Sequence, residues 1–181
     1  MVPNTGQQYL AGDKEALRQI LELLAGRGYD VFGPAVRDGA IVYDRLASVE
    51  ELPAGWRDVQ EAGRYRLERR GDEALFGYVV GPQSWKKFLH PADVRLFEAK
   101  RTDSGLQIIE HREPPKRYAF VGVRACEVAA IRIQDRVLLE DRYTDATYQG
   151  RRNGAFIVAA NCTEPAPTCF CASMGTGPRV T

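Results

Sequence analysis

The sequence lacks the features that mark several large classes of protein. No stretch approaches the ~20 apolar residues of a transmembrane helix. Residues 1–8 carry neither the basic nor the apolar region of a signal peptide. The formal net charge is only +1 over 181 residues, so charge gives no sign of a nucleic-acid or membrane partner. We therefore expect a cytoplasmic protein without a membrane span.

Recognisable catalytic and nucleotide-binding patterns are also missing. The chain has two histidines, His90 and His111, and neither stands at metal-ligand spacing from a partner. No Ser-His-Asp or Cys-His arrangement is readable, so nucleophilic hydrolysis has no support. Gly175 and Gly177 suggest a phosphate loop only weakly, because no long apolar strand leads directly into them. The sequence therefore assigns no catalytic residue.

Cysteine is scarce as well, but the few cysteines are clustered. Three of the four, Cys162, Cys169 and Cys171, fall within ten positions, and Cys126 lies upstream. In a reducing compartment, clustered cysteines are more often metal ligands or redox groups than disulfides. We interpret the four thiols as one metal site.

The order of the elements around these cysteines explains how they meet. Residues 117–123 and 155–160 are apolar runs typical of buried strands, and residues 128–138 have the periodicity of a helix. A strand-helix-strand unit makes its two strands parallel, so their carboxyl ends share one edge of the sheet. Cys126 leaves the first strand at that edge, and Cys162 leaves the second.

A proline-containing loop brings the remaining two cysteines back toward the same edge. Pro165 and Pro167 stiffen this loop and remove hydrogen-bond donors that a further strand would need. Cys169 and Cys171 follow directly. Four sulfur atoms can therefore converge at one place.

Spacing alone leaves the identity of the site open. An iron–sulfur cluster accepts irregular spacing, because its ligands can come from separate loops. Structural zinc also uses four thiolates, but usually in pairs two to four positions apart, which only Cys169 and Cys171 approach. A redox pair would normally be Cys-x-x-Cys, and this pair is Cys-x-Cys. A metal-free binding domain with four free thiols is the remaining alternative.

The rest of the chain predicts a scaffold of helices and hairpins. Residues 13–28 form an amphipathic helix with Asp13 as N-cap and Gly26 or Gly28 at its end. Further elements are expected as follows: a hairpin over 30–46, a helical turn at 48–53, a hairpin pairing 65–69 with 74–80, a helix within 81–91, and a hairpin pairing 94–100 with 106–110. We predict a mixed α/β (α+β) fold and a single domain, with a scaffold over 1–115 and the cluster-binding βαβ part over 116–181.

Several motifs resemble one known family. The residues from Phe120 to Ala130 contain Gly-x-Arg-x-Cys at the end of a strand, and Cys169 to Pro178 reads Cys-Phe-Cys-x-Ser-Met-Gly-x-Gly-Pro. Lys86 to Pro91 and the Arg151-Arg152 pair match further segments in order. These motifs resemble the iron–sulfur beta subunits of cytosolic nickel–iron hydrogenases (sulfhydrogenases), and one of the subunits of anaerobic sulfite reductase is similar.

The resemblance implies a function in electron transfer. It implies a [4Fe–4S] cluster held by Cys126, Cys162, Cys169 and Cys171. It also implies electron exchange between a flavin- or nicotinamide-binding partner subunit and a catalytic subunit, so that the chain is not catalytic alone. A structural zinc-binding assembly protein without redox activity remains the alternative from another class.

The chain departs from this family in two respects. Glu127 stands where the family has Asp after the first cysteine. The family also continues into a dicluster ferredoxin domain, whereas this chain ends at Thr181, so it is either a fragment or a short form. We expect Arg124, two residues before Cys126, to favour the reduced state of the cluster; a plain surface charge is the alternative. The two glycines after Cys171 predict a close approach of the backbone to a neighbour.

Overall fold

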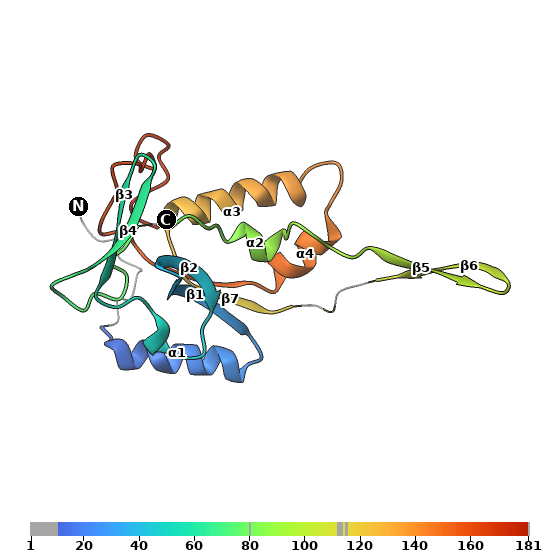
Figure 1. Cartoon of the computed structure of the whole chain (residues 1–181), viewed down its shortest axis with the longest axis horizontal. Coiled ribbons are helices and arrows are strands. Elements are labelled where there is room, and N and C mark those ends of the chain that lie inside the picture. The colour runs from blue at the N-terminus through green and yellow to red at the C-terminus, as the bar shows by residue number, and fades with distance from the viewer. Residues whose placement is uncertain (1–10, 80, 112–113, 115, 181) are drawn as a thin grey trace, which may run out of the picture.

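The computed structural model describes residues 11–79, 81–111, 114 and 116–180 (Figure 1). Residues 1–8, on which the expectation of no signal peptide rests, lie outside this part. The described chain combines four helices, a short 3₁₀ turn and eight strands, which confirms the expected mixed α/β class. No described helix is long and apolar enough to cross a membrane.

The central sheet joins strands from the beginning and the end of the chain. Its order is β2-β1-β7-β8, with β1 and β2 antiparallel and with β7 parallel to both β1 and β8. The strands are β1 (Asp30–Arg37), β2 (Ala40–Arg45), β7 (Tyr118–Val123) and β8 (Phe156–Ala159). The parallel pair β7–β8 confirms the predicted strand-helix-strand unit.

Helices cover both faces of this sheet (Figure 1). On one face, α1 (Lys14–Gly26) packs Leu21 and Leu24 near Ala119 and Val121 of β7. The other face holds Phe120 within a second core cluster that contains Trp85, Leu89, Ile131 and Tyr148. The helices on that side are α2 (Lys86–Leu89), α3 (Ala125–Leu138) and α4 (Ala146–Asn153). Successive residues of β7 point to opposite faces, so this fully buried strand serves both cores.

Local sequence signals set most of the outer elements. The Asp13 side chain accepts a hydrogen bond from Ala16 N at 3.0 Å and caps α1, and Gly28 follows the helix with a φ of 78°. Asp38 and Gly39 both have positive φ in the two-residue turn between β1 and β2. The helical turn at 48–53 is the 3₁₀ turn η1 (Val49–Glu51), and the last predicted hairpin is β5 (Phe97–Thr102) with β6 (Gly105–Glu110).

One predicted hairpin is wrong. Strand β4 (Arg64–Arg69) pairs with the preceding β3 (Trp56–Glu61) and not with the residues that follow it. The reason is Gly63, whose φ of 71° forms the tight turn between β3 and β4. Residues 74–79 contain no strand and include buried residues beside β7.

Burial in the C-terminal part also differs from the prediction. Strand β8 lies at the edge of the sheet, and Phe156 is exposed, so it is not a buried strand. On α3, Ile131 is buried, but Ile133 and Val137 are more than half exposed. Helix α4 was not predicted; Asp145 caps it by accepting a hydrogen bond from Tyr148 N at 2.8 Å.

Candidate metal centre

A glycine bulge ends β7 just before the first cysteine. Gly122 has a φ of 84°, and the pairing of β7 with β8 shifts register between Val121 and Val123. A Cβ atom on Gly122 would lie 2.8 Å from the Phe76 ring and 3.3 Å from the Tyr78 hydroxyl. Glycine is therefore required for residues 76–78 to pack against the strand where the chain turns toward the cysteines.

Cys126 lies in the first turn of α3, where the helix start is fixed by its neighbour Glu127. The Glu127 carboxylate accepts a hydrogen bond from Arg124 N at 2.9 Å and a second from the Tyr43 hydroxyl. Burial raises the pKa of Glu127. Burial also raises the pKa of the Cys126 thiol, and the charges of Glu127 and Cys171 add to this effect. Without a cation in the site, the Cys126 thiol is therefore held in its protonated form more strongly than a free thiol.

The other three cysteines lie on one closed loop, residues 161–178, which we call the cysteine loop. Cys162 N donates to the Pro178 carbonyl at 3.0 Å, so the two ends of the loop are joined. Inside it, Ala166 N donates to Cys169 Sγ at 3.3 Å, and Thr176 N donates to the Cys171 carbonyl at 2.9 Å. Backbone hydrogen bonds thus give the loop a defined shape.

All four cysteines line a single cavity of about 330 Å³, which we call the cysteine cavity. Cys126, Cys162 and Cys171 are half-buried, and Cys169 is exposed. Within the described residues, no three His, Cys, Asp or Glu side chains are grouped tightly enough to hold a single metal ion. In a [4Fe–4S] cluster, each cysteine binds a different iron atom, so the ligands surround a larger body than one ion.

Arg124 connects this cavity to the body of the protein, and it is not the surface charge that the sequence left as an alternative. Its side chain is only 1% exposed. Its two terminal nitrogens donate to the carbonyls of Asn161 at 2.8 Å, Phe76 at 2.8 Å and Tyr78 at 3.1 Å. Its Nε is buried without a hydrogen-bond partner in the described part of the chain. Because Arg124 also lines the cysteine cavity, a fixed positive charge lies at the wall of the candidate site.

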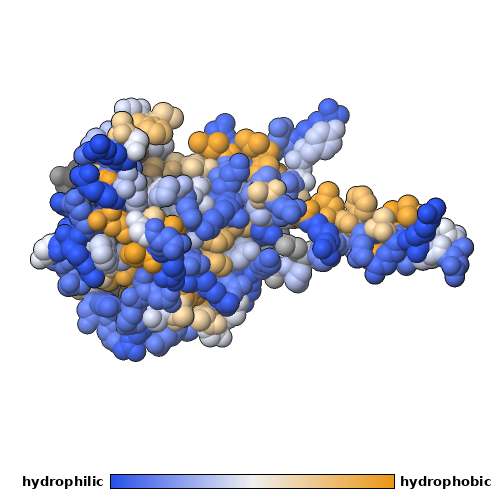
Figure 2. Space-filling view, in the orientation of Figure 1, coloured by the Kyte–Doolittle hydropathy of each residue, from blue (hydrophilic) through white to orange (hydrophobic). Residues whose placement is uncertain are grey.

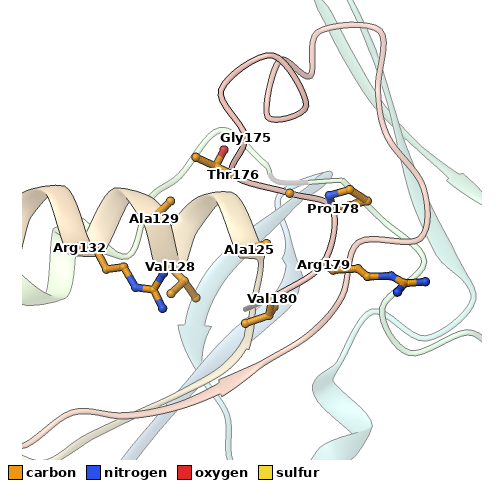
Figure 3. Close-up of a pocket in the computed structure, with 10 residues that line it drawn as sticks. Ala125, Val128, Ala129, Arg132, Gly175, Thr176, Pro178, Arg179 and Val180 are labelled. Atoms are coloured by element: carbon orange, nitrogen blue, oxygen red, sulfur yellow. The ribbon is translucent and has the colours of Figure 1, made fainter. Parts of the chain in front are cut away.

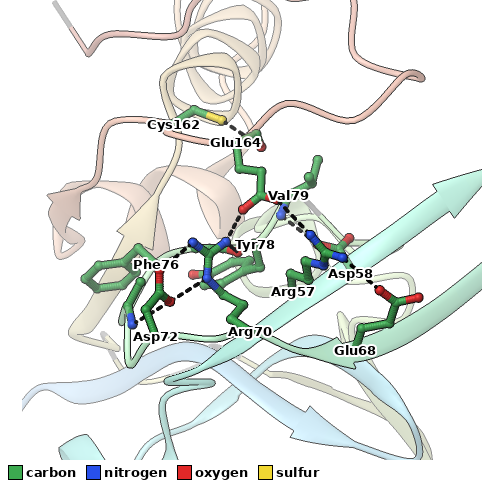
Figure 4. A network of polar contacts seen from close by, with 12 residues as sticks. Arg57, Asp58, Glu68, Arg70, Asp72, Phe76, Tyr78, Val79, Cys162 and Glu164 are labelled. Atoms are coloured by element: carbon green, nitrogen blue, oxygen red, sulfur yellow. Dashed lines mark hydrogen bonds and ion pairs between the residues drawn. The ribbon is translucent and has the colours of Figure 1, made fainter.

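A second arginine fixes the middle of the cysteine loop (Figure 4). Arg70 forms an ion pair with Glu164, and it also bonds the Gly77 carbonyl at 3.0 Å and Asp72 at 2.7 Å. This arrangement lowers the pKa of Asp72 to about 2, chiefly through its hydrogen bond with Arg70. Arg57 lies 3.9 Å from the Glu164 carboxylate on the other side. Glu164 therefore links the cysteine loop to the β3–β4 hairpin and to the segment that follows it.

The exit of the cysteine loop passes close to a cysteine sulfur. A Cβ atom on Gly177 would lie 3.1 Å from Cys171 Sγ, whereas one on Gly175 would meet nothing within 4 Å. Gly175 instead has a φ of 64°, which favours glycine for backbone reasons. The close approach expected from the two glycines therefore occurs at Gly177.

A second cavity of about 390 Å³ lies on the other side of this exit (Figure 3). Ala125, Gly177 and Pro178 line both cavities, so a thin wall separates them. In Figure 3, Arg132 and Arg179 stand at opposite ends of the second cavity. The cysteine cavity thus lies close to the surface on the side of α3.

The structure adds residues that sequence reasoning missed. Neither Arg70 nor Glu164 was singled out, although Glu164 stands between two cysteines and its charge in an otherwise uncharged loop was a usable signal. No local signal identifies Arg70, because its partner is 94 positions away.

Comparison with known proteins gives one similarity. The chain is 30% identical over 149 residues to the sulfhydrogenase 2 subunit beta of Pyrococcus furiosus. The match covers 74% of this chain and 41% of that protein, so the chain spans less than half the length of this relative. No family model matches the chain, and no solved structure matches it. The similarity supports the hydrogenase beta-subunit family that the motifs resemble.

Proposed function

From this similarity to a hydrogenase beta subunit, we propose that the chain is an electron-transfer module of a hydrogenase-type redox complex. It would hold a [4Fe–4S] cluster on Cys126, Cys162, Cys169 and Cys171. The observation that carries the proposal is the gathering of all four cysteines, from two segments of the chain, around one cavity. The relative's name, a subunit of a sulfhydrogenase, is consistent with this role.

The donor set fits an iron–sulfur cluster in chemistry and in charge. Four thiolates are the usual ligands of a [4Fe–4S] cluster, and such a cluster supplies one-electron transfer when it is bound. Thiolates must be deprotonated to bind a metal, and the raised pKa of Cys126 describes the site without that cation. Metal binding at Cys126 would therefore release a proton that this chain otherwise holds.

The protein around the cavity would adjust the reduction potential. The buried guanidinium of Arg124 stabilises negative charge in the cavity that it lines. An added electron increases that negative charge, so Arg124 favours the reduced state and raises the potential. The first-turn amides of α3, which carries Cys126, act in the same direction.

The partners would be the other subunits of such a complex. A module that only carries electrons needs one partner that supplies them and one that consumes them. We propose a flavin- or nicotinamide-binding subunit and a catalytic subunit in these roles. The chain itself offers no catalytic residue in this scheme.

Anaerobic purification with metal and sulfide analysis tests the proposal. We expect a brown protein with broad visible absorption that bleaches on reduction, and about four iron and four sulfide per chain. The spectrum should be lost in Cys126→Ser and in Cys162→Ser. A colourless protein with one bound zinc would support the structural alternative, and four freely titrating thiols in fresh protein would indicate a metal-free domain. Either result would overturn the proposal.

A further inference from the structure

A two-stranded hairpin projects from the body of the protein, far from the cysteine cavity (Figure 1). We call residues 97–110 the arm; it consists of β5 and β6 joined at Asp103 and Ser104. Every residue of both strands is exposed. A hairpin of two strands is at best marginally stable in water without packing against another surface.

The two faces of the arm differ in polarity. In the observed register, Ala99 stands opposite Ile108 and Arg101 opposite Leu106, so these side chains share one face with Phe97. On this face Phe97 is 59% exposed, Leu106 69% and Ile108 55%. The other face carries Glu98, Lys100, Gln107 and Ile109, with an ion pair between Lys100 and Glu98. Figure 2 shows a hydrophobic strip along one side of the arm and hydrophilic atoms along the other.

The apolar face continues into a basic cavity at the base of the arm. Leu96, which is 68% exposed and precedes Phe97, lines this cavity of about 550 Å³. Four basic side chains line it as well, and no acidic residue is found among the described residues of its wall; the basic ones are Arg95, His111, Lys116 and Arg151. Arg151 is buried and held by the Phe88 carbonyl at 2.7 Å, so its position is fixed.

We propose that the arm and this basic cavity form one docking surface for another protein subunit. The subunit would present an apolar strip to the face of Phe97, Leu106 and Ile108, and acidic side chains to the basic cavity. Exposed apolar surface next to charge of one sign is typical of an interaction site and not of a solvated loop. The proposal rests on the proposed function only in treating the chain as a subunit, and it does not require the cluster.

Charge argues for a different protein and against a second copy of this chain. In a symmetric dimer, the same surface is used on both copies. The arm of a second copy offers Lys100 and Arg101 beside Glu98 and Asp103, charges that nearly cancel. It therefore provides no acidic match for the basic cavity, whereas an acidic partner would.

The test uses the complex as it assembles in cells that express the full chain with an affinity tag. Hydrogen exchange is compared between the isolated complex and the free chain. We expect slower exchange of the β5 and β6 amides in the complex. Carbodiimide coupling, which joins amines to carboxylates, should link Lys116 to an Asp or Glu of the partner subunit identified by mass spectrometry.

Variants on the two faces of the arm then separate docking from folding. Leu106→Lys combined with Ile108→Lys should weaken rebinding of the isolated partner subunit at least tenfold. Gln107→Lys, on the polar face of the same strand, should leave it unchanged. Arg95→Glu should also weaken binding, and less so at high salt, because the attraction is screened.

Three outcomes would overturn the inference. Equal exchange of the arm in the complex and the free chain would exclude docking there. Equal effects of the two β6 variants would show that the apolar face is not used. Protection that depends only on the concentration of the purified chain would assign the face to a second copy. The visible spectrum of each sample is recorded in parallel, so a missing cluster with an intact arm interaction would count against the proposed function alone.

Discussion

Arg124 and Asn161 join the two segments that carry the cysteines. Arg124 Nη1 donates to the Asn161 carbonyl at 2.8 Å, directly between the residue before α3 and the residue before Cys162. The same guanidinium bonds the carbonyls of Phe76 and Tyr78. One buried side chain therefore ties the end of β7, the cysteine loop and the segment after the β3–β4 hairpin together.

Arg124→Lys should destabilise the metal-free protein. Lysine keeps the charge, but its single amine cannot replace a planar fork that bonds three carbonyls. Loss of two charged hydrogen bonds in a buried place costs about 3 kcal/mol of unfolding free energy. Urea denaturation under reducing conditions measures this difference.

Arg117→Lys is the matched control for that variant. Arg117 also donates to a backbone carbonyl, that of Arg27 at 2.9 Å, but it is exposed. We expect its substitution to cost less than about 1 kcal/mol. Equal losses in the two variants would show that Arg124 has no special role in holding the segments together.

Glu164→Gln should loosen the cysteine loop without unfolding the protein. The substitution removes the ion pair with Arg70 and the attraction to Arg57, while Arg70 keeps Asp72 and the Gly77 carbonyl. We expect the cluster to be lost several-fold faster to an iron chelator, as followed by the decay of visible absorption. Glu61→Gln, which removes an exposed pair with Arg66 at 3.6 Å, should not change this rate. An unchanged rate in Glu164→Gln would mean that the loop does not need this link.

Gly177→Ala and Gly175→Ala should separate sulfur contact from backbone strain. A Cβ on Gly177 would press on Cys171 Sγ from 3.1 Å, so we expect less iron per chain. A Cβ on Gly175 meets nothing, but its positive φ costs roughly 1–2 kcal/mol, so stability should fall while iron content stays near normal. Iron analysis and thermal unfolding of both variants measure these effects. Lower iron in Gly175→Ala than in Gly177→Ala would contradict the assignment.

Cys169→Ser and Cys171→Ser should abolish the cluster and leave the two hydrophobic cores intact. Both cores consist of residues from the sheet, α1 and α2–α4, and none of their members is a cysteine. We expect near-native far-ultraviolet circular dichroism with no visible absorption. Ser173→Ala, in the same loop, should retain the spectrum. Global unfolding of the cysteine variants would instead make the metal a folding element.

Local signals predicted the elements that depend on local causes. The cap at Asp13, the turn at Asp38 and Gly39, and the buried run of β7 each act within a few residues, and each was found from the sequence. The parallel pairing of β7 with β8 also followed from the chain order, because a helix between two adjacent strands leaves few topologies. The convergence of the cysteine segments was expected from the same rule, and their role as ligands stays a prediction.

Features that depend on distant residues could not be predicted. The β4 pairing was wrong because two turn glycine positions competed, and Gly63 has the positive φ that a tight turn needs. The exposure of Ile133 on α3 contradicts the helical pattern, since which part of the helix faces the sheet is decided by tertiary packing. Arg124 was placed correctly next to the site, but its burial depends on carbonyls 37 to 48 positions away.

The arginine contacts of the cysteine loop affect the order of events in maturation. Asn161 and Glu164 are held by Arg124 and Arg70, which belong to the polypeptide and are in place as soon as it folds. The cavity therefore forms from protein contacts alone, and iron delivery can be the last step of biogenesis. A chain made before its cluster is available would then wait as a folded acceptor, and a cell could store it and load it later without a chaperone to hold an unfolded loop.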